Sequence, residues 1–337
     1  MRGRWILAFA VGLSPLVGGT GVPATSHLSP GFRLLIAGSP RRLQTAIEEA
    51  SARYAVAFGV PASGVAVLRQ LDVLEPASSW RVPEGRAAIE QALAQGYRGV
   101  PGTLDTVDGR VALIARMTSE SERWPSLLLG SRSIDYLERQ MQQAHTGGLR
   151  AIGMASDGQG HWALFEDREP RGEAARGAFI VSGDPASLEL KLARRADAGY
   201  RIAETSAWRL GLFWLEHTGA TRTSSPRFDY RVLSGVESRA IELQMNLVAS
   251  QGFRYTVETM RALRMLGLGW MGGPGSEFIV IMESDRHRPP HRYRVVAGRR
   301  ASTLTREFDA AAGNGFVPVG LVVGLAERET LILLERR

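Results

Sequence analysis

The chain has 337 residues, of which 44% are hydrophobic and 22% are charged, so its composition is that of a folded protein and excludes a disordered one. It contains no cysteine, which excludes disulfides, thiolate nucleophiles and cysteine–zinc sites. The formal net charge of +7 comes almost wholly from arginine, because Lys191 is the only lysine. Arginine in place of lysine suits phosphate binding. The codon bias of a GC-rich genome also gives arginine in place of lysine, and we favour that explanation.

The N-terminal segment has the pattern of an export signal. Arginines at its start precede the apolar run Trp5–Val17, and Val22 and Ala24 place small residues before a cleavage site. We therefore predict a signal peptide over residues 1–24 and a mature chain that is periplasmic or secreted. No later segment has the length and apolarity of a membrane span, so we expect no integral membrane segment after cleavage. The alternative is that the N-terminal segment stays uncleaved as an anchor.

The first predicted unit covers residues 31–70. Phe32–Ala37 has the composition of a strand, proline at position 40 marks a helix start, and Leu43–Arg53 is the helix. Tyr54–Phe58 and Val65–Leu68 then predict a hairpin. The same strand–helix–strand–strand order is predicted again over 78–118, 125–168, 177–217, 227–285 and 291–337.

The fifth unit has the clearest pattern. Its predicted strands are Tyr230–Leu233, Arg254–Thr259 and Phe278–Met282, and its helix is Glu237–Gln251. A single apolar stripe runs along that helix and ends at Gly252, a residue that suits the left-handed position after a helix. The stripe consists of Ile241, Met245, Val248 and Ala249.

A glycine at the matching helix end returns at a nearly constant interval. The intervals are 52, 51, 53 and 63 residues, and a period of this size is typical of a repeat protein. The sequence therefore predicts an α+β fold of six tandem β-α-β-β repeats of about 50 residues, packed in pairs or in a ring. The glycines, which we interpret as structural caps, are Gly96, Gly148, Gly199, Gly252 and Gly315.

The fifth unit also carries a short motif, in which Asn246 lies six residues before the pair Gly252-Phe253 and the unit closes at Glu283. This Leu-Asn…Gly-aromatic pattern, with methionine in place of the leucine, resembles a small uncharacterised bacterial β-α-β-β domain family of unknown function. The resemblance implies the fold of each unit and no activity. Because the asparagine is absent from the other units, we expect it to cap the helix or dock a strand rather than to catalyse a reaction. The matching positions are Glu90, Gln142, Ala193 and Asp309.

The closing strands are continuously apolar, as in Phe278–Met282 and Leu210–Leu215. A strand that is wet on one face alternates apolar and polar residues, so both faces of these strands are predicted to be buried. One helix per unit covers one face. We expect another unit to cover the second face, packed sheet to sheet or joined edge to edge.

Histidine and carboxylate residues in the third unit supply the only catalytic hypothesis. Asp157, His161 and Glu166 are compatible with a hydrolytic site built between units, with His161 as base and Asp157 as its orienter. His145 lies on the apolar face of its helix, where a buried structural histidine is the expected role.

Basic residues between the fifth and sixth units are compatible with anion binding or with a solvated linker. Two prolines separate the histidines of this segment, so they share no helix face. The segment comprises Arg286, His287, Arg288, His291 and Arg292. Another set of arginines, Arg98, Arg150, Arg201 and Arg254, follows the helix-end glycines, and we favour a solubilising role at the strand starts.

The long hairpin of the fifth unit, Met260–Ser276, combines apolar and arginine residues in the way that protein contact surfaces do. We predict that it contacts a partner, with burial on a neighbouring unit as the alternative. The candidate binding residues are Arg261, Arg264, Met265, Trp270 and Met271.

Taken together, the sequence favours an exported, non-enzymatic repeat protein that acts as a binding module or scaffold in the bacterial envelope. Its expected partner is an unidentified protein or envelope polymer, and we predict no cofactor, no metal site and no nucleic-acid partner. The alternative is an enzyme, of the hydrolase class, with its site between repeats around His161 and Asp157.

Overall fold

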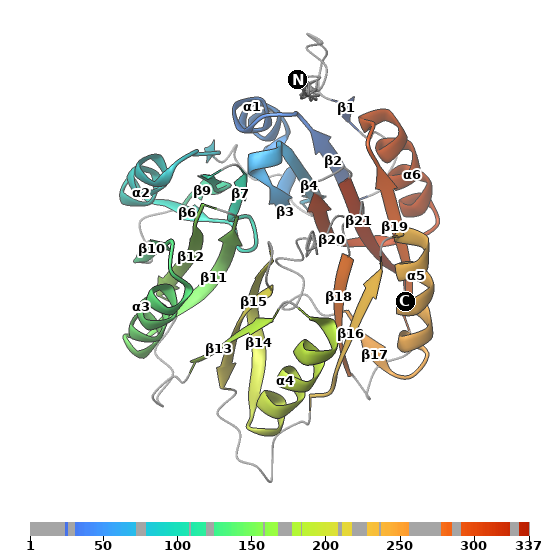
Figure 1. Cartoon of the computed structure of the whole chain (residues 1–337). Helices are drawn as coiled ribbons and strands as arrows, with labels where there is room; N and C mark the ends of the chain where they lie inside the picture. The colour runs from blue at the N-terminus through green and yellow to red at the C-terminus, as the bar shows by residue number, and fades with distance from the viewer. Residues whose placement is uncertain are drawn as a thin grey trace, which may run out of the picture.

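The computed structural model of the chain describes residues 24–25, 31–71, 79–107, 109–118, 125–157, 159–167, 177–182, 184–207, 211–217, 228–235, 237–255, 278–284, 291–323 and 330–336. Within these ranges the fold is mixed α and β, with six α-helices and small antiparallel sheets. The helices lie around the outside of the molecule and the strands lie inside them (Figure 1). None of the helices in the described ranges has the length and apolarity needed to cross a membrane.

Strand, helix, strand and strand follow one another in six groups, which we call units one to six. In each unit the last strand lies in the middle of the sheet, between the first strand and the strand that follows the helix. Units one to three comprise β2 (Phe32–Ile36), α1 (Pro40–Ala50), β3 (Tyr54–Val60) and β4 (Val65–Gln70); β5 (Trp80–Arg81), α2 (Arg86–Ala94), β6 (Tyr97–Gly99) and β9 (Ala115–Met117); and β10 (Ser126–Ser131), α3 (Ile134–Thr146), β11 (Leu149–Ser156) and β12 (His161–Asp167). Units four to six comprise β13 (Gly177–Ser182), α4 (Pro185–Asp197), β14 (Tyr200–Ala207) and β15 (Gly211–His217); β16 (Tyr230–Gly235), α5 (Ser238–Ala249), β17 (Phe253–Arg254) and β18 (Phe278–Ser284); and β19 (Arg292–Gly298), α6 (Ala301–Gly313), β20 (Val317–Val323) and β21 (Thr330–Arg336).

Three short elements lie outside this order. The strand β1 (Ala24–Thr25) pairs with β2, and a 3-10 turn, η1 (Pro61–Ser63), joins β3 to β4. A small hairpin of β7 (Asp105–Val107) and β8 (Arg110–Ala112) is inserted in unit two. Because of this insertion the closing strand of unit two is β9 and not Val111–Ile114, the apolar run just before it. That segment is more deeply buried than β9, whose Arg116 and Met117 are only partly buried, so apolar character alone does not mark a strand of the main sheet.

Local sequence signals account for where three of the helices begin, α1, α3 and α4. The side chains of Ser39, Ser133 and Asp184 each accept a hydrogen bond from a backbone N–H of the first helical turn. These bonds satisfy donors that have no partner inside the helix. Proline stands at the first position of α1 and α4, where its missing N–H costs nothing.

Glycines account for where five of the helices end. After α5, the N–H of Gly252 donates to the carbonyl of Ala249 at 3.0 Å, and its φ of 88° is in the left-handed region. A residue with a Cβ is strained in that region, so the chain reverses at glycine and enters β17. The five residues are Gly96 (φ 88°), Gly148 (φ 94°), Gly199 (φ 85°), Gly252 (φ 88°) and Gly315 (φ 80°).

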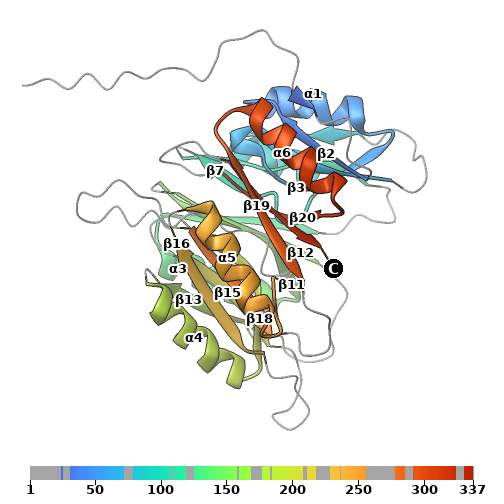
Figure 2. The same ribbon diagram turned by 90° about the vertical axis from the view of Figure 1, so that its right-hand side faces the viewer.

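Each helix packs against its own sheet and also against the sheet of the next unit. The core around α4, for example, contains Leu188 and Leu192 of that helix together with Tyr230, Ile279 and Ile281 of unit five. Figure 2 shows α5 in the corresponding place, between β16 and β19. Every core of the described residues therefore belongs to two consecutive units.

This packing explains why the closing strands are continuously apolar. Alternate residues of a strand point to opposite faces. In β15, Leu212 and Trp214 belong to the core of α3, whereas Phe213 and Leu215 belong to the core of α4. The second face of each sheet is thus covered by another unit, as expected, and mainly by the helix of the preceding unit.

The contacts between units return to their starting point. Leu304 and Phe308 of α6 share a core with Leu34, Val65 and Val67 of unit one. The backbone of β1 extends the sheet of unit one beside α6. The units therefore follow one another around a closed ring, as their circular order in Figure 1 shows.

Candidate binding site

In units two to six the first strand is an edge strand, and side chains of the preceding helix bond the backbone of several of these edges. At β19, Glu242 Oε2 accepts a hydrogen bond from the N–H of Val295 at 2.8 Å. One helical turn later, Asn246 Oδ1 accepts from the N–H of Tyr293, and Asn246 Nδ2 donates to the carbonyl of Tyr293, both at 2.9 Å. The amide of Asn246 thus replaces a neighbouring strand, which is the strand-docking role expected for it.

Similar polar contacts occur at other boundaries between units. Gln44 Oε1 accepts from the N–H of Val82 at 3.1 Å, and Gln142 Nε2 donates to the carbonyl of Gly177 at 2.8 Å. Uncovered edges invite pairing with other chains, so these side chains protect the edges as well as hold the units together.

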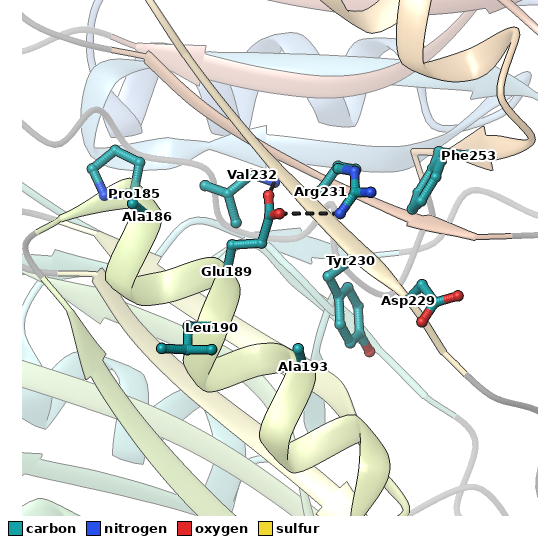
Figure 3. Close-up of a pocket in the computed structure, with 10 residues that line it drawn as sticks. All are labelled: Pro185, Ala186, Glu189, Leu190, Ala193, Asp229, Tyr230, Arg231, Val232 and Phe253. Atoms are coloured by element: carbon teal, nitrogen blue, oxygen red, sulfur yellow. Dashed lines mark hydrogen bonds and ion pairs between the residues drawn. The ribbon is translucent and has the colours of Figure 1, made fainter.

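The boundary between α4 and β16 matches that between α5 and β19 at one helix position and differs at the next. Glu189 Oε2 accepts from the N–H of Val232 at 2.8 Å, as Glu242 does at β19. Ala193 stands where α5 has Asn246, and it offers no polar group to Tyr230. Figure 3 shows Ala193 on the side of α4 that faces the start of β16.

A pocket of about 710 Å³ lies at this boundary. Its apolar part includes Leu190, whose exposed fraction is 54%, and Phe253. Its charged part includes Arg231, which lies 5.2 Å above the ring of Phe253 and bonds Glu189 Oε1 at 3.1 Å. The lining residues are Pro185, Ala186, Glu189, Leu190, Ala193, Asp229, Tyr230, Arg231, Val232 and Phe253 (Figure 3). A pocket with mixed walls beside an edge strand is suited to binding part of a polypeptide.

Two of the arginines that follow the helix-end glycines join neighbouring units. Arg98 of unit two bonds Glu166 of unit three through Nε and Nη2, at 2.5 and 2.7 Å. Arg201 of unit four bonds Glu283 of unit five in the same way, with a shortest distance of 2.8 Å. Both carboxylates are buried. For these two arginines a solubilising role is therefore wrong, because they form buried pairs between units.

The residues of the catalytic hypothesis are only partly brought together. Ser156 Oγ lies 2.5 Å from His161 Nδ1, and Asp157 is the next residue. Glu166 lies five residues further along β12, about 17 Å away at the rise of a strand, and bonds Arg98. Burial lowers the pKa of His161, and the charge of Asp157 offsets part of that effect.

Asp157 has a structural role that its sequence context does not reveal. Its Oδ2 accepts from Thr106 Oγ1 and from the N–H of Gly109, and its Oδ1 accepts from the N–H groups of Gln159 and Gly160. Burial opposes ionisation, but the hydrogen bonds outweigh it and lower the pKa of Asp157 below 3.8. The carboxylate thereby ties the β7–β8 hairpin to the turn between β11 and β12.

Replacing Asp157 with asparagine is expected to lower the free energy of unfolding by about 2–3 kcal/mol at pH 7, because an NH2 group then faces backbone donors. The stabilisation belongs to the ionised form, so it is present above pH 3.8 and disappears as the pH falls through the lowered pKa of Asp157. Urea denaturation across this range measures both effects, with exposed Asp135→Asn as the control. A difference that persists unchanged in acid would contradict this role.

His145 and His291, the two other described histidines for which the sequence predicts a role, are both buried. His145 packs edge-to-face on Trp214, with ring centroids 5.4 Å apart, as expected of a core position. His291 Nδ1 lies 2.7 Å from Glu335 Oε1. A buried histidine beside a carboxylate does not present a surface for anions, so the assignment of His291 to an anion-binding patch is wrong.

Other predicted site residues lie outside the described part of the chain. They are the anion-patch residues Arg286, His287 and Arg288, and the hairpin residues Arg261, Arg264, Met265, Trp270 and Met271. Arg292 is described and is exposed at the start of β19. Within the described ranges no three histidine, aspartate or glutamate side chains are grouped in a way that could hold a metal ion.

Comparison with known proteins adds no relative: no family model, no curated protein and no solved structure matches the chain.

Proposed function

We propose that this chain is an exported binding module or scaffold of the bacterial envelope, built from six tandem β-α-β-β repeats of a small uncharacterised domain. The repeats span 31–70, 78–118, 125–168, 177–217, 227–285 and 291–337, after a signal peptide over 1–24. The partner is a protein or an envelope polymer. The observation that carries the proposal is the pocket between α4 and β16, where exposed Leu190 stands among charged residues.

The use of polar groups elsewhere supports binding rather than catalysis. Asp157 accepts four hydrogen bonds within the protein, and Glu166 is occupied by Arg98. The contact between Ser156 and His161 is the observation that favours the alternative, a hydrolase with a site between units two and three. Ser156 is only 1% exposed, so a substrate has little access to its hydroxyl, and we favour the binding function.

A photo-crosslinking amino acid at position 190, introduced into the full chain and activated in whole cells, tests the proposal. Position 243 is the matched control, because Leu243 follows Glu242 on α5 as Leu190 follows Glu189 on α4, and its exposed fraction is 65%. We expect one crosslinked partner from position 190, in the periplasmic or secreted fraction, and only background from position 243. Equal labelling from both positions, or none from either, would contradict a binding site at this pocket.

A further inference from the structure

The outer edge of the first strand is covered differently in unit one than in unit six. At β19 the side chain of Glu242 accepts a hydrogen bond from the N–H of Val295 at 2.8 Å. Counted back from the helix-end glycine, Thr305 of α6 stands at the place of Glu242. Its Oγ1 is buried and makes no hydrogen bond within the described ranges. Along the edge of β2 lies a strand instead, β1, which is in contact with α6.

The hydrogen bonds between β1 and β2 belong to one pair of residues. The N–H of Ala37, at the end of β2, donates to the carbonyl of Gly64 at 2.8 Å, so the backbone groups of Ala37 point toward β4. Backbone groups of successive residues in an antiparallel strand point to opposite sides. Those of Ile36 therefore point toward β1, where Ile36 lies opposite Ala24. Ala24 thus supplies both the donor and the acceptor that this edge needs.

The signal peptide proposed above ends between the two residues of β1. Cleavage after Ala24 removes the residue that bonds Ile36 and leaves Thr25, which lies opposite Leu35. The backbone groups of Leu35 point toward β4, because they alternate with those of Ile36. The remaining residue of β1 therefore makes no ladder bond to β2, and the N–H and C=O of Ile36 lose their partners.

The place of Ala24 lies on the face of the sheet that packs against α6. Residues directly opposite one another in a sheet put their side chains on the same face. Ile36 packs against the core that contains Leu304 and Phe308 of α6, so the residue opposite Ile36 faces the same helix. Because that residue is an alanine in the uncleaved chain, we expect the place to accept a small apolar side chain.

We propose that the edge of β2 at Ile36 is a strand-binding site that signal-peptide cleavage opens, and that an extended segment of a polypeptide partner fills it by antiparallel pairing. Addition of a strand to a free sheet edge is a general mode of peptide recognition. That a strand fits along β2 beside α6 follows from the place of β1. A second cleaved copy lacks Ala24 as well, so we assign the site to a different polypeptide. The proposal rests on the export proposed above and is independent of the pocket between α4 and β16.

Hydrogen exchange at the Ile36 amide tests whether cleavage opens the edge. We expect this amide to exchange at least about tenfold faster in the chain that starts at Thr25 than in the full chain, the factor that corresponds to one net hydrogen bond. The Ala37 amide, which bonds Gly64, is the internal control and should exchange equally in both chains. Equal exchange of the Ile36 amide in both chains would overturn the proposal.

The probe for the open edge is the peptide Gly-Val-Pro-Ala-Thr-Ser-His, which has the sequence of residues 21–27. Added to the chain that starts at Thr25, it should slow exchange at Ile36 in a saturable way. The matched control peptide has an N-methyl group on its alanine and so lacks the N–H that donates to the carbonyl of Ile36. We expect it to bind at least about tenfold more weakly. Equal protection by both peptides, or none by either, would refute the strand site.

Mass spectrometry of the N-terminus of the chain purified from cells separates this proposal from the export on which it rests. A cellular chain that starts at Thr25 and takes the peptide supports both. One that starts at Thr25 and does not take the peptide refutes the strand site while the export stands. A cellular chain that retains Ala24 refutes opening by cleavage, and its recovery from the cytoplasm refutes the export as well.

Discussion

Phe308→Ala is expected to lower the free energy of unfolding by about 3–5 kcal/mol, among the largest effects of any single substitution in this chain. Phe308 is fully buried in α6, in the core that joins unit six to unit one. Truncation leaves a cavity among Leu34, Val67 and Leu334, which the rigid sheets on both sides cannot close. Urea denaturation followed by circular dichroism measures the change.

Leu247→Ala on α5 is the matched control, because that leucine is 63% exposed. Its loss should change the free energy of unfolding by no more than about 0.5 kcal/mol. If α6 did not contact unit one, Phe308 would lose part of its burial, and its truncation would cost less. Similar, small values for both variants would show that the ring is open at this boundary in solution.

Glu283→Ala is expected to lower the free energy of unfolding by about 3 kcal/mol, because it leaves Arg201 without the carboxylate that holds it between units four and five. Removal of one partner from a buried ion pair typically costs about 3–5 kcal/mol, and we take the low end because the Arg201 side chain is 30% exposed. A double-mutant cycle with Arg201→Met isolates the interaction from the loss of packing.

Glu90→Ala is the control for that experiment. Arg86 and Glu90 form an exposed pair within α2, with side-chain exposures of 54% and 46%. Such a pair contributes at most about 0.5 kcal/mol. If Glu283→Ala costs no more than Glu90→Ala, the pair between Arg201 and Glu283 does not stabilise the boundary between units.

The sequence contains a further indication of the contacts between units. Carboxylates close four of the predicted units at matching positions, Glu166, Glu216, Glu283 and Glu335. Arginines occur at a matching interval, and the structure shows that Arg98 and Arg201 pair with a carboxylate of the next unit. Ala193 was visible as the position that matches Asn246. Only the structure shows what this difference changes, because nothing in the sequence indicates that Asn246 bonds Tyr293, 47 residues later.

The sequence by itself determined the local elements of this protein. Strand and helix follow from the periodicity of apolar residues, helix starts from Ser39, Ser133 and Asp184, and helix ends from glycine, because each signal acts over a few residues of chain. It also required both faces of the closing strands to be buried. Only the tertiary structure decided that the helix of the preceding unit covers the second face, that α6 closes on unit one, and that a pocket remains between α4 and β16. Those outcomes depend on contacts between residues far apart in the chain, and several partners of similar apolarity satisfy the local pattern equally well.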